Sequence, residues 1–304
     1  MKENAPIVVF VYNRLDHAKA VLKSLSNCDL AKQSTIYIFS DGAKNEKAIE
    51  SVAKVREFIN SEQIKDWFFE VNVIESIQNK GLAKSVISGV DSVIRKSNKV
   101  IVVEDDNIVS KDFLVFMNDA LNYYEKNLKI WCVGGYTLPI KFPKDYKEDV
   151  FLMGRGSSYA WATWIDRWEK IDWDIKDYQQ FKQNKKLQRK FNAYGNDACY
   201  MLDRQMNKGI DSWAIRFLYN AFKNGQHFVL PVKSRVQNTG NDGSGIHVSQ
   251  SDHRFDTKIE NQHPKAIFKD VDIDSRIVKK YRKVFNISLK IKMKRFIKNR
   301  FKRG

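Results

Sequence analysis

The fold prediction depends most on one stretch, Val100-Ile101-Val102-Val103-Glu104-Asp105-Asp106. Four β-branched apolar residues in a row predict a strand that is buried on both faces, as in a parallel sheet flanked by helices. The three carboxylates after it repel one another, and each loses solvation in a partly closed site. Because ligands of open α/β sheets bind at the carboxyl ends of strands, we expect a divalent cation here that joins protein carboxylates to a diphosphate. The alternative is a solvated acidic turn that begins a helix.

The first hundred residues support this prediction, because apolar strands alternate with helices. Strands are expected at 7–11, 36–39, 69–74 and 100–103. Helices are expected between them, ending near residues 26, 60 and 96. Asp16 and Asp112 are candidate N-caps, of the first helix and of a helix that ends near residue 124. Strands joined in this way form a doubly wound, mostly parallel α/β sheet flanked by helices. No G-x-G-x-x-G or P-loop motif occurs, so neither a dinucleotide site nor a P-loop is indicated.

The second half is predicted to be more mixed. Strands are expected at 131–136, 151–153 and 228–232, and helices at about 176–192, 196–207 and 213–224. Trp161, Trp164 and Trp168 lie at helical spacing, which favours packing in the core or on a helix for two of them. Trp161 is also a candidate for stacking on a sugar. A Gly-rich loop at 238–247 ends in His247.

Composition indicates a globular protein. The 304 residues are 43% hydrophobic and 12% aromatic, which is enough for one large domain or two small ones. Cys28, Cys132 and Cys199 form no C-x-x-C pair, so neither a disulfide framework nor a zinc site is indicated, and a reducing compartment is expected. No run of about 18 apolar residues occurs, so no membrane span is predicted. We therefore expect a cytoplasmic protein.

Most of the positive charge lies near the C-terminus. Of the net charge of +17, twelve Lys or Arg and no acid lie in 279–304, which leaves +5 on residues 1–278. Five apolar residues there recur on one face of a helix: Leu289, Met293, Phe296, Ile297 and Phe301. Such a basic amphipathic helix suits an anionic bilayer, so we expect peripheral binding to the inner face of a bacterial cell membrane. Nucleic-acid binding and a solvated helix are the alternatives.

A series of motifs along residues 5–250 resembles the GT-A glycosyltransferases, and among them the N-acetylglucosaminyltransferase I family. The motifs are the strand at 6–10 with Asn13-Arg14, Ser40-Asp41-Gly42, 102–106 with Asp112-Phe113, Trp131-Cys132-Val133, and Asp211-Ser212-Trp213. The resemblance implies a GT-A domain at 1–250, with a nucleotide-binding half at 1–125 and a mixed acceptor half at 126–250. Residues 251–304 would form a C-terminal extension that carries the basic helix.

The resemblance also implies roles for the residues that follow the strands. Asp106 would be the direct ligand of Mn²⁺ or Mg²⁺. Asp105 and Glu104 would hold the ribose and order the site. Arg14 and Asp41 would hold the nucleotide.

Two further residues are candidates for the reaction itself. Asp211 is expected to be the catalytic base that takes a proton from an acceptor hydroxyl, and its alternative is an ordinary helix N-cap. The family has a second Asp where this chain has Ser212, so the local electrostatics differ. His247 is a candidate for contacting the diphosphate or the metal when the loop closes.

These observations predict a metal-dependent, inverting glycosyltransferase. Its donor is expected to be a nucleotide sugar, a UDP-sugar such as UDP-GlcNAc, and its acceptor a hydroxyl of a glycan or lipid-linked molecule in surface polysaccharide (lipopolysaccharide-type) synthesis. One alternative is a nucleotidyltransferase acting on sugar phosphates, which usually has a Gly-rich loop after the first strand; Tyr12-Asn13-Arg14-Leu15 has none. A nucleic-acid-binding protein is the other alternative, although it would not explain the acidic triplet. We expect no nucleic-acid partner.

Overall fold

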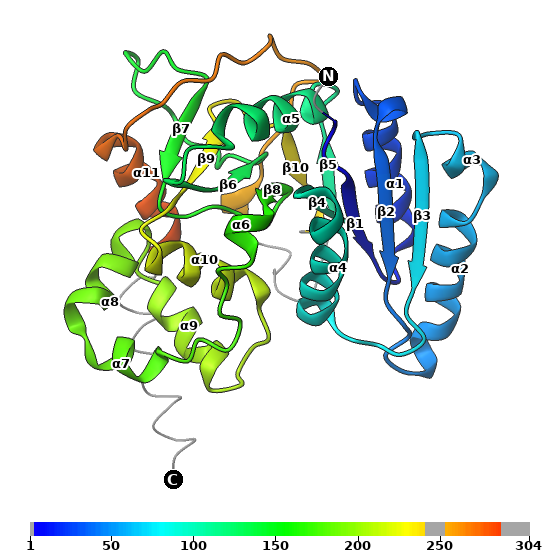
Figure 1. Ribbon diagram of the computed structural model, residues 1–304, viewed down its shortest axis with the longest axis horizontal. Helices are drawn as coiled ribbons and strands as arrows, with labels where there is room; N and C mark the ends of the chain where they lie inside the picture. Colours follow the sequence, from blue (N-terminus) through cyan, green and yellow to red (C-terminus); the bar gives the residue numbers. More distant parts are fainter. Residues whose placement is uncertain (1–2, 241–252, 287–304) are drawn as a thin grey trace.

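An eight-stranded sheet runs through the molecule and is flanked by helices (Figure 1). The computed structural model describes residues 3–240 and 253–286. The strand order is β3-β2-β1-β4-β8-β6-β9-β7. The strands are β1 (Ile7–Val11), β2 (Thr35–Ser40), β3 (Glu70–Glu75), β4 (Lys99–Glu104), β6 (Ile130–Gly134), β7 (Val150–Met153), β8 (Trp161–Trp164) and β9 (His227–Pro231).

The N-terminal half of the sheet is parallel, as predicted. β1 pairs with β2 on one side and with β4 on the other, and β2 pairs with β3. The residues at 100–103 are fully buried, as expected of a strand covered on both faces. Crossover helices α1 (Leu15–Ser26), α2 (Ile49–Ile59) and α4 (Leu82–Ser97) join these strands. The doubly wound α/β class is therefore confirmed. Asp16 is not the N-cap of α1, because Arg14 holds that position and Asp16 lies in the first turn.

The other half of the sheet is mixed. β8 runs antiparallel to β4 and β6, β9 is parallel to β6, and β7 is antiparallel to β9. The spacing of the tryptophans was misleading, because Trp161 and Trp164 belong to strand β8 and only Trp168 lies in a helix, α6 (Ile165–Trp168). All four residues of β8 are buried, so this strand lacks the apolar–polar alternation that would have identified it.

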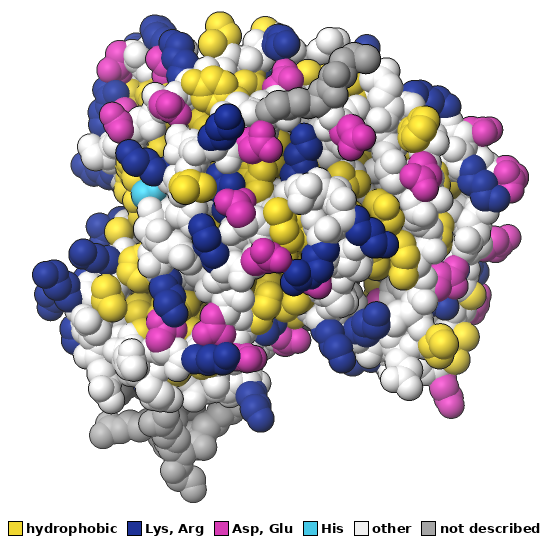
Figure 2. Space-filling view, in the orientation of Figure 1, with side chains coloured by type: hydrophobic (Ala, Val, Ile, Leu, Met, Phe, Trp, Pro, Cys, Tyr) yellow, Lys and Arg dark blue, Asp and Glu magenta, His cyan; other side chains and the backbone are white. Residues whose placement is uncertain are grey.

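Five helices of the second half pack around this mixed part of the sheet or on each other. They are α5 (Phe113–Tyr124), α7 (Tyr178–Gln183), α8 (Lys185–Phe191), α9 (Ala198–Met206) and α10 (Trp213–Lys223). The single helix expected at 176–192 is two helices, because Asn184 ends α7 and caps α8 by accepting hydrogen bonds from the N–H groups of Lys186 and Leu187. Lys and Arg side chains stand out at the left edge of Figure 2, where α7 and α8 lie in Figure 1.

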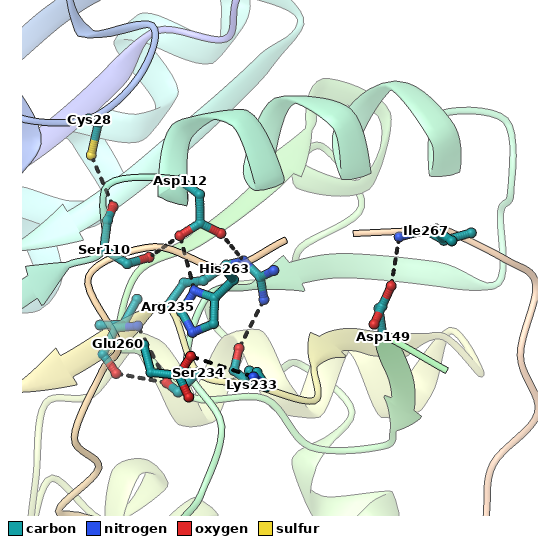
Figure 3. Close-up of polar contacts among 11 residues, drawn as sticks. Cys28, Ser110, Asp112, Asp149, Lys233, Ser234, Arg235, Glu260, His263 and Ile267 are labelled. Atoms are coloured by element: carbon teal, nitrogen blue, oxygen red, sulfur yellow. Dashed lines mark hydrogen bonds and ion pairs between the residues drawn. The ribbon is translucent and has the colours of Figure 1, made fainter. Parts of the chain in front are cut away.

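Residues 253–286 return across the domain and end in α11 (Ser275–Phe285). Asp112, the predicted N-cap of α5, has the cap position but makes no capping hydrogen bond. Its carboxylate instead accepts hydrogen bonds from Ser110 Oγ (2.8 Å) and Arg235 Nε (2.9 Å), and lies 3.0 Å from His263 Nδ1 (Figure 3). The segment expected as an extension is thus partly attached to the domain through buried polar groups.

The predicted basic helix around residues 289–301 lies outside the described residues. Its expected start at 279 is not where the fold ends, because Ile277 and Tyr281 of α11 are buried. Within residues 3–240 and 253–286, no helix combines the length and the apolar character that a membrane crossing requires.

Candidate active site

A cleft of about 480 Å³ opens at the carboxyl ends of β1, β2 and β4. This is the switch point of the sheet, since the chain passes from β1 to β2 on one side and β4 lies on the other. Six of the eight predicted site residues line the cleft: Arg14, Asp41, Glu104, Asp105, Asp106 and Asp211. They come from segments up to two hundred residues apart, so the fold brings them together as the motif series implied.

Arg14 sits against the acidic triplet. Its Nε donates to Asp105 Oδ2 (3.2 Å), its Nη2 contacts Asp105 Oδ1, and the same Nη2 lies 3.2 Å from Asp106 Oδ2. Burial alone would lower the pKa of Arg14, but the hydrogen bonds and charge of Asp105 raise it above its ordinary value. The contact arises because β1 and β4 are parallel neighbours, so the residues after them meet at one edge. One cation is therefore already shared by two of the three carboxylates.

Glu104 is the most perturbed acid of the cleft. Its Oε1 is enclosed and has no hydrogen-bond partner among the described residues. Burial, together with the charges of Asp106 and Asp105, raises the pKa of Glu104 to about 8, although the Trp213 indole and Arg14 favour the charged form. Burial also raises the pKa of Asp105, against the opposing effect of Arg14. At neutral pH the triplet thus carries less negative charge than three ordinary acids would.

A second, two-stranded sheet holds Asp106 in place. β10 (Val236–Asn238) pairs antiparallel with β5 (Asn107–Val109). Asp106 Oδ1 accepts hydrogen bonds from Asn107 Nδ2 (2.8 Å) and Asn238 Nδ2 (2.9 Å). A side chain at Gly240 would place its Cβ 2.5 Å from Asp106 Oδ2, so glycine lets the loop approach this carboxylate without displacing it. The loop stands out in the sequence for its glycines and His247, but the contacts of Asn238 and Gly240 with Asp106 were not predicted.

The donor groups of the cleft fit a hard cation held by one carboxylate. Within residues 3–240 and 253–286, no group of three or more His, Cys, Asp or Glu side chains is arranged to hold a metal ion. Mg²⁺ commonly needs only one or two protein carboxylates, because substrate phosphates and waters supply its other ligands. Asp106 fits that role, since it lines the cleft, its Oδ1 is oriented by two amides, and its Oδ2 lies 3.2 Å from Arg14 Nη2.

Asp41 anchors the loop in front of α4. Its Oδ1 accepts hydrogen bonds from the N–H groups of Gly42 and Lys80 (both 2.9 Å), and its Oδ2 from Gly81 N–H (2.9 Å) and Asn79 Nδ2 (3.1 Å). These donors occupy most of the acceptor capacity of the carboxylate. Asp41 therefore shapes the cleft wall by joining the end of β2 to residues 79–81. That wall also carries Lys80, which the motif series did not include.

Asp211 lines the cleft just before α10 and presents its carboxylate to solvent. Its side chain is 66% exposed and forms an ion pair with Arg216 Nη2 at 2.9 Å. The N-cap alternative for Asp211 is wrong, because Ser212 caps α10 by accepting a hydrogen bond from Ile215 N–H. The carboxylate of Asp211 thus pairs with a side chain of α10 instead of capping the helix, and it remains accessible from the cleft.

The remaining two predicted residues are not part of the described cleft. Trp161 is 1% exposed and stacks on Trp213 at 5.1 Å between ring centroids, so it packs in the core and offers no face to a sugar. His247 lies outside the described residues. The aromatic ring that does line the cleft near β8 is Tyr159, which sits edge-on to Tyr136 at 4.9 Å.

Comparisons with known proteins give a likeness of fold only. No protein-family model matches the chain, and no curated protein matches it. Among the solved structures that match is the crystal structure of S. aureus TarS, with a TM-score of 0.43 and 12% sequence identity. The match covers 79% of this chain and 37% of the TarS chain, so this chain spans little more than a third of TarS. The sheet itself has the doubly wound, mostly parallel α/β order predicted from the sequence in its N-terminal half.

Proposed function

We propose that this protein is a metal-dependent, inverting glycosyltransferase that uses a nucleotide sugar. The observation that carries the proposal is the convergence of Arg14, the acidic triplet and Asp211 on one cleft at the switch point of the sheet. The donor is expected to be a UDP-sugar such as UDP-GlcNAc, since four of the motifs that suggested this class contribute residues to the cleft: Asn13-Arg14, Ser40-Asp41, 104–106 and Asp211-Ser212-Trp213.

The triplet and its neighbours suit a leaving diphosphate. A Mn²⁺ or Mg²⁺ ion held by Asp106 would stabilise the negative charge that grows on the leaving oxygen. Lys44 and Lys80 also line the cleft and can add positive charge near a diphosphate. Asp105, which Arg14 holds by a hydrogen bond, would accept a hydrogen bond from a ribose hydroxyl. Glu104, with a raised pKa, can donate a hydrogen bond in its protonated form.

Asp211 suits the role of general base. Its exposed carboxylate borders the same cleft as the triplet and is open to solvent, so an acceptor hydroxyl could reach it. In a single in-line displacement the hydroxyl oxygen forms the new glycosidic bond, the bond to the diphosphate breaks, and Asp211 takes the hydroxyl proton. The configuration at the anomeric carbon then inverts, and no covalent intermediate with the protein is required. Such a base contributes about 10²–10⁴-fold to the rate.

The acceptor is proposed to be a glycan or a lipid-linked molecule of surface polysaccharide synthesis, reached at the inner face of the cell membrane. The support for this setting is the basic sequence that follows α11, with eight Lys or Arg and no acid in 287–304. A nucleotidyltransferase is less well supported, because no Gly-rich loop follows β1 and Arg14 there is engaged by Asp105.

Calorimetric titration of UDP into the protein, with and without Mn²⁺, tests the proposal. We expect binding that depends on the metal in the wild type and is lost in Asp106→Ala. Glu57→Ala, which removes an exposed carboxylate from α2, is the matched control and should bind as the wild type does. Failure of the wild type to bind UDP or any other nucleoside diphosphate with Mn²⁺ would contradict the proposal.

A further inference from the structure

The exposed face of α8 is strongly basic and has no acidic partner. Lys185, Lys186, Arg189 and Lys190 are all exposed, and α8 contains no acid. None of the four forms an ion pair with any residue of 3–240 or 253–286, whereas Lys182 of the neighbouring helix α7 pairs with Asp203 at 3.1 Å. Unpaired cations concentrated in seven residues repel one another, so they favour an external anionic partner.

α11 continues this basic face. Its Ile277 and Tyr281 point into the core, while Lys279, Arg282 and Lys283 are exposed and have no ion pair within the described part of the chain. α8 and α11 both contact the short turn η3 (Asn192–Tyr194).

The two helices also lie on the same side of the molecule. The N–H of Asn196 donates to Asn286 Oδ1 at 3.2 Å, just after η3 and α11. α11 lies directly above α8 at the left of Figure 1, and Figure 2 shows Lys and Arg side chains along that edge. We call the seven cations together the α8–α11 surface: Lys185, Lys186, Arg189, Lys190, Lys279, Arg282 and Lys283.

We propose that the α8–α11 surface binds an anionic phospholipid bilayer. Leu187 is 38% exposed among the lysines of α8, as suits a helix lying in the headgroup layer. The described exposed faces of α8 and α11 carry no exposed aromatic ring on which a nucleic-acid base could stack. The chain leaves this surface at Asn286 with eighteen further residues that include eight Lys or Arg, so the basic sequence continues from the same side.

This surface would bring the membrane to the half of the protein that carries Asp211. α8 contacts α9, and α9 contacts α10, at whose start Asp211 lies. A bilayer against α8 and α11 is therefore linked by a short chain of packed helices to the wall of the cleft where the acceptor is proposed to enter. The inference extends the proposed membrane setting from the basic sequence after α11 to the folded body, and it does not depend on donor chemistry.

Vesicle flotation with the full chain tests this inference. The vesicles are phosphatidylcholine alone, or phosphatidylcholine with 30% phosphatidylglycerol (about a third anionic, as in the surfaces that polybasic segments bind). We expect the wild type to float only with the anionic vesicles. Replacing Lys185, Lys186, Arg189 and Lys190 with Gln should weaken this partition at least about tenfold, since each cation near such a surface contributes to binding.

A matched variant removes four charges elsewhere. Lys47, Lys54, Lys65 and Lys96 are exposed and lie in the nucleotide-binding half, so their replacement with Gln should leave flotation as in the wild type. Equal loss in both variants would mean that net charge, not the α8–α11 surface, drives binding. If circular dichroism shows that the α8 variant is unfolded, the double variant Arg189→Gln/Lys190→Gln takes its place. Its partition onto anionic vesicles should then fall by less than is expected for the fourfold variant.

Three results would overturn the inference. The α8 variant could float as well as the wild type, or the wild type could show no preference for anionic vesicles. The third is that the α8 variant loses the binding to a DNA duplex that the wild type shows, while it still binds vesicles. The last result would assign the surface to nucleic acid. UDP titration of the same α8 variant separates this inference from the proposed function. Unchanged UDP binding with lost flotation supports both, whereas lost UDP binding with unchanged flotation contradicts this inference.

Discussion

At the scale of single residues, Arg14 holds the acidic triplet together, and its removal should be costly. Asp105 is largely buried, and Arg14 supplies both of its charged hydrogen bonds. Arg14→Met keeps the aliphatic stem but leaves the buried carboxylate of Asp105 without the guanidinium, so we expect the free energy of unfolding to fall by about 3 kcal/mol. Urea denaturation measures this. Arg95→Met, which removes an exposed arginine paired with Asp91 and Glu169, should lower the free energy of unfolding far less. Equal losses in the two variants would show that Arg14 is not a buried partner.

Asp211 makes a second prediction at this scale, on the reaction. Asp211→Asn keeps the size of the side chain but removes its basicity, so turnover should fall by about 10²–10⁴-fold. UDP affinity, measured by calorimetry, should stay unchanged because the carboxylate of Asp211 pairs with Arg216 and, among the described residues, contacts neither Arg14 nor the triplet. Ser212→Ala separates this effect from loss of the cap, since it should cost about 1 kcal/mol of stability and little turnover. If Asp211→Asn lost UDP affinity as well as turnover, Asp211 would have a role in donor binding and would not act as a base alone.

The acidic residues 104–106 could be predicted from the sequence pattern, because they end a buried strand and ligands bind at that edge of a parallel sheet. Arg14, Asp41 and Asp211 carried no such local signal and were proposed only through the resemblance to a known family. Trp161 was misjudged because its neighbours at helical spacing hide a buried strand. Asn238 and Gly240 carried no such signal: their contact with Asp106 depends on the pairing of β10 with β5, across more than a hundred residues, which no local pattern records.

At the scale of elements, the β5–β10 pair should control the position of Asp106. Gly240→Ala would place a Cβ 2.5 Å from Asp106 Oδ2, so either the loop or the carboxylate must shift. We expect metal-dependent UDP affinity to fall at least about tenfold, because a direct ligand would be displaced by more than binding tolerates. The melting temperature should change little, since the substitution lies at the surface of the cleft. If Gly240→Ala bound UDP with the affinity of the wild type, the loop after β10 would not control the position of the Asp106 carboxylate.

The attachment of residues 253–286 to α5 should depend on pH. Burial alone would raise the pKa of Asp112, but hydrogen bonds from His263 and Ser110 and the charge of Arg235 lower it. An acid whose pKa is lowered in the folded state stabilises the fold above its ordinary pKa, and this contribution is lost as the pH falls through the lowered value. The difference in unfolding free energy between wild type and Asp112→Asn should therefore be constant near neutral pH and shrink below about pH 4. If urea titrations gave the same difference in unfolding free energy at pH 3 as at neutral pH, this prediction for Asp112 would be wrong.

At the scale of the whole molecule, composition and structure place the boundary between the folded domain and the basic C-terminal sequence at different residues. The charge count separates residues 279–304 from the rest, because it records Lys and Arg but not burial. α11 instead alternates basic residues with Ile277 and Tyr281, whose side chains complete the core. The hydroxyl of Tyr281 accepts a hydrogen bond from Leu138 N–H (3.3 Å), and its ring lies 5.6 Å from that of Phe151. The basic sequence thus begins with residues 279–285 of a helix that packs on the core, which charge alone could not reveal.

Two truncations test where the folded protein ends. A chain that ends at Asn286 keeps α11 and should melt at the temperature of the full chain, while anionic vesicles bind it more weakly because eight cations are gone. A chain that ends at Val278 loses Tyr281, and loss of one large buried aromatic side chain alone costs about 3–5 kcal/mol. We expect this chain to melt well below the other two, by circular dichroism, and Tyr281→Ala in the full chain to reproduce most of the loss. Identical melting of both truncated chains would show that α11 is dispensable and that the fold ends before it.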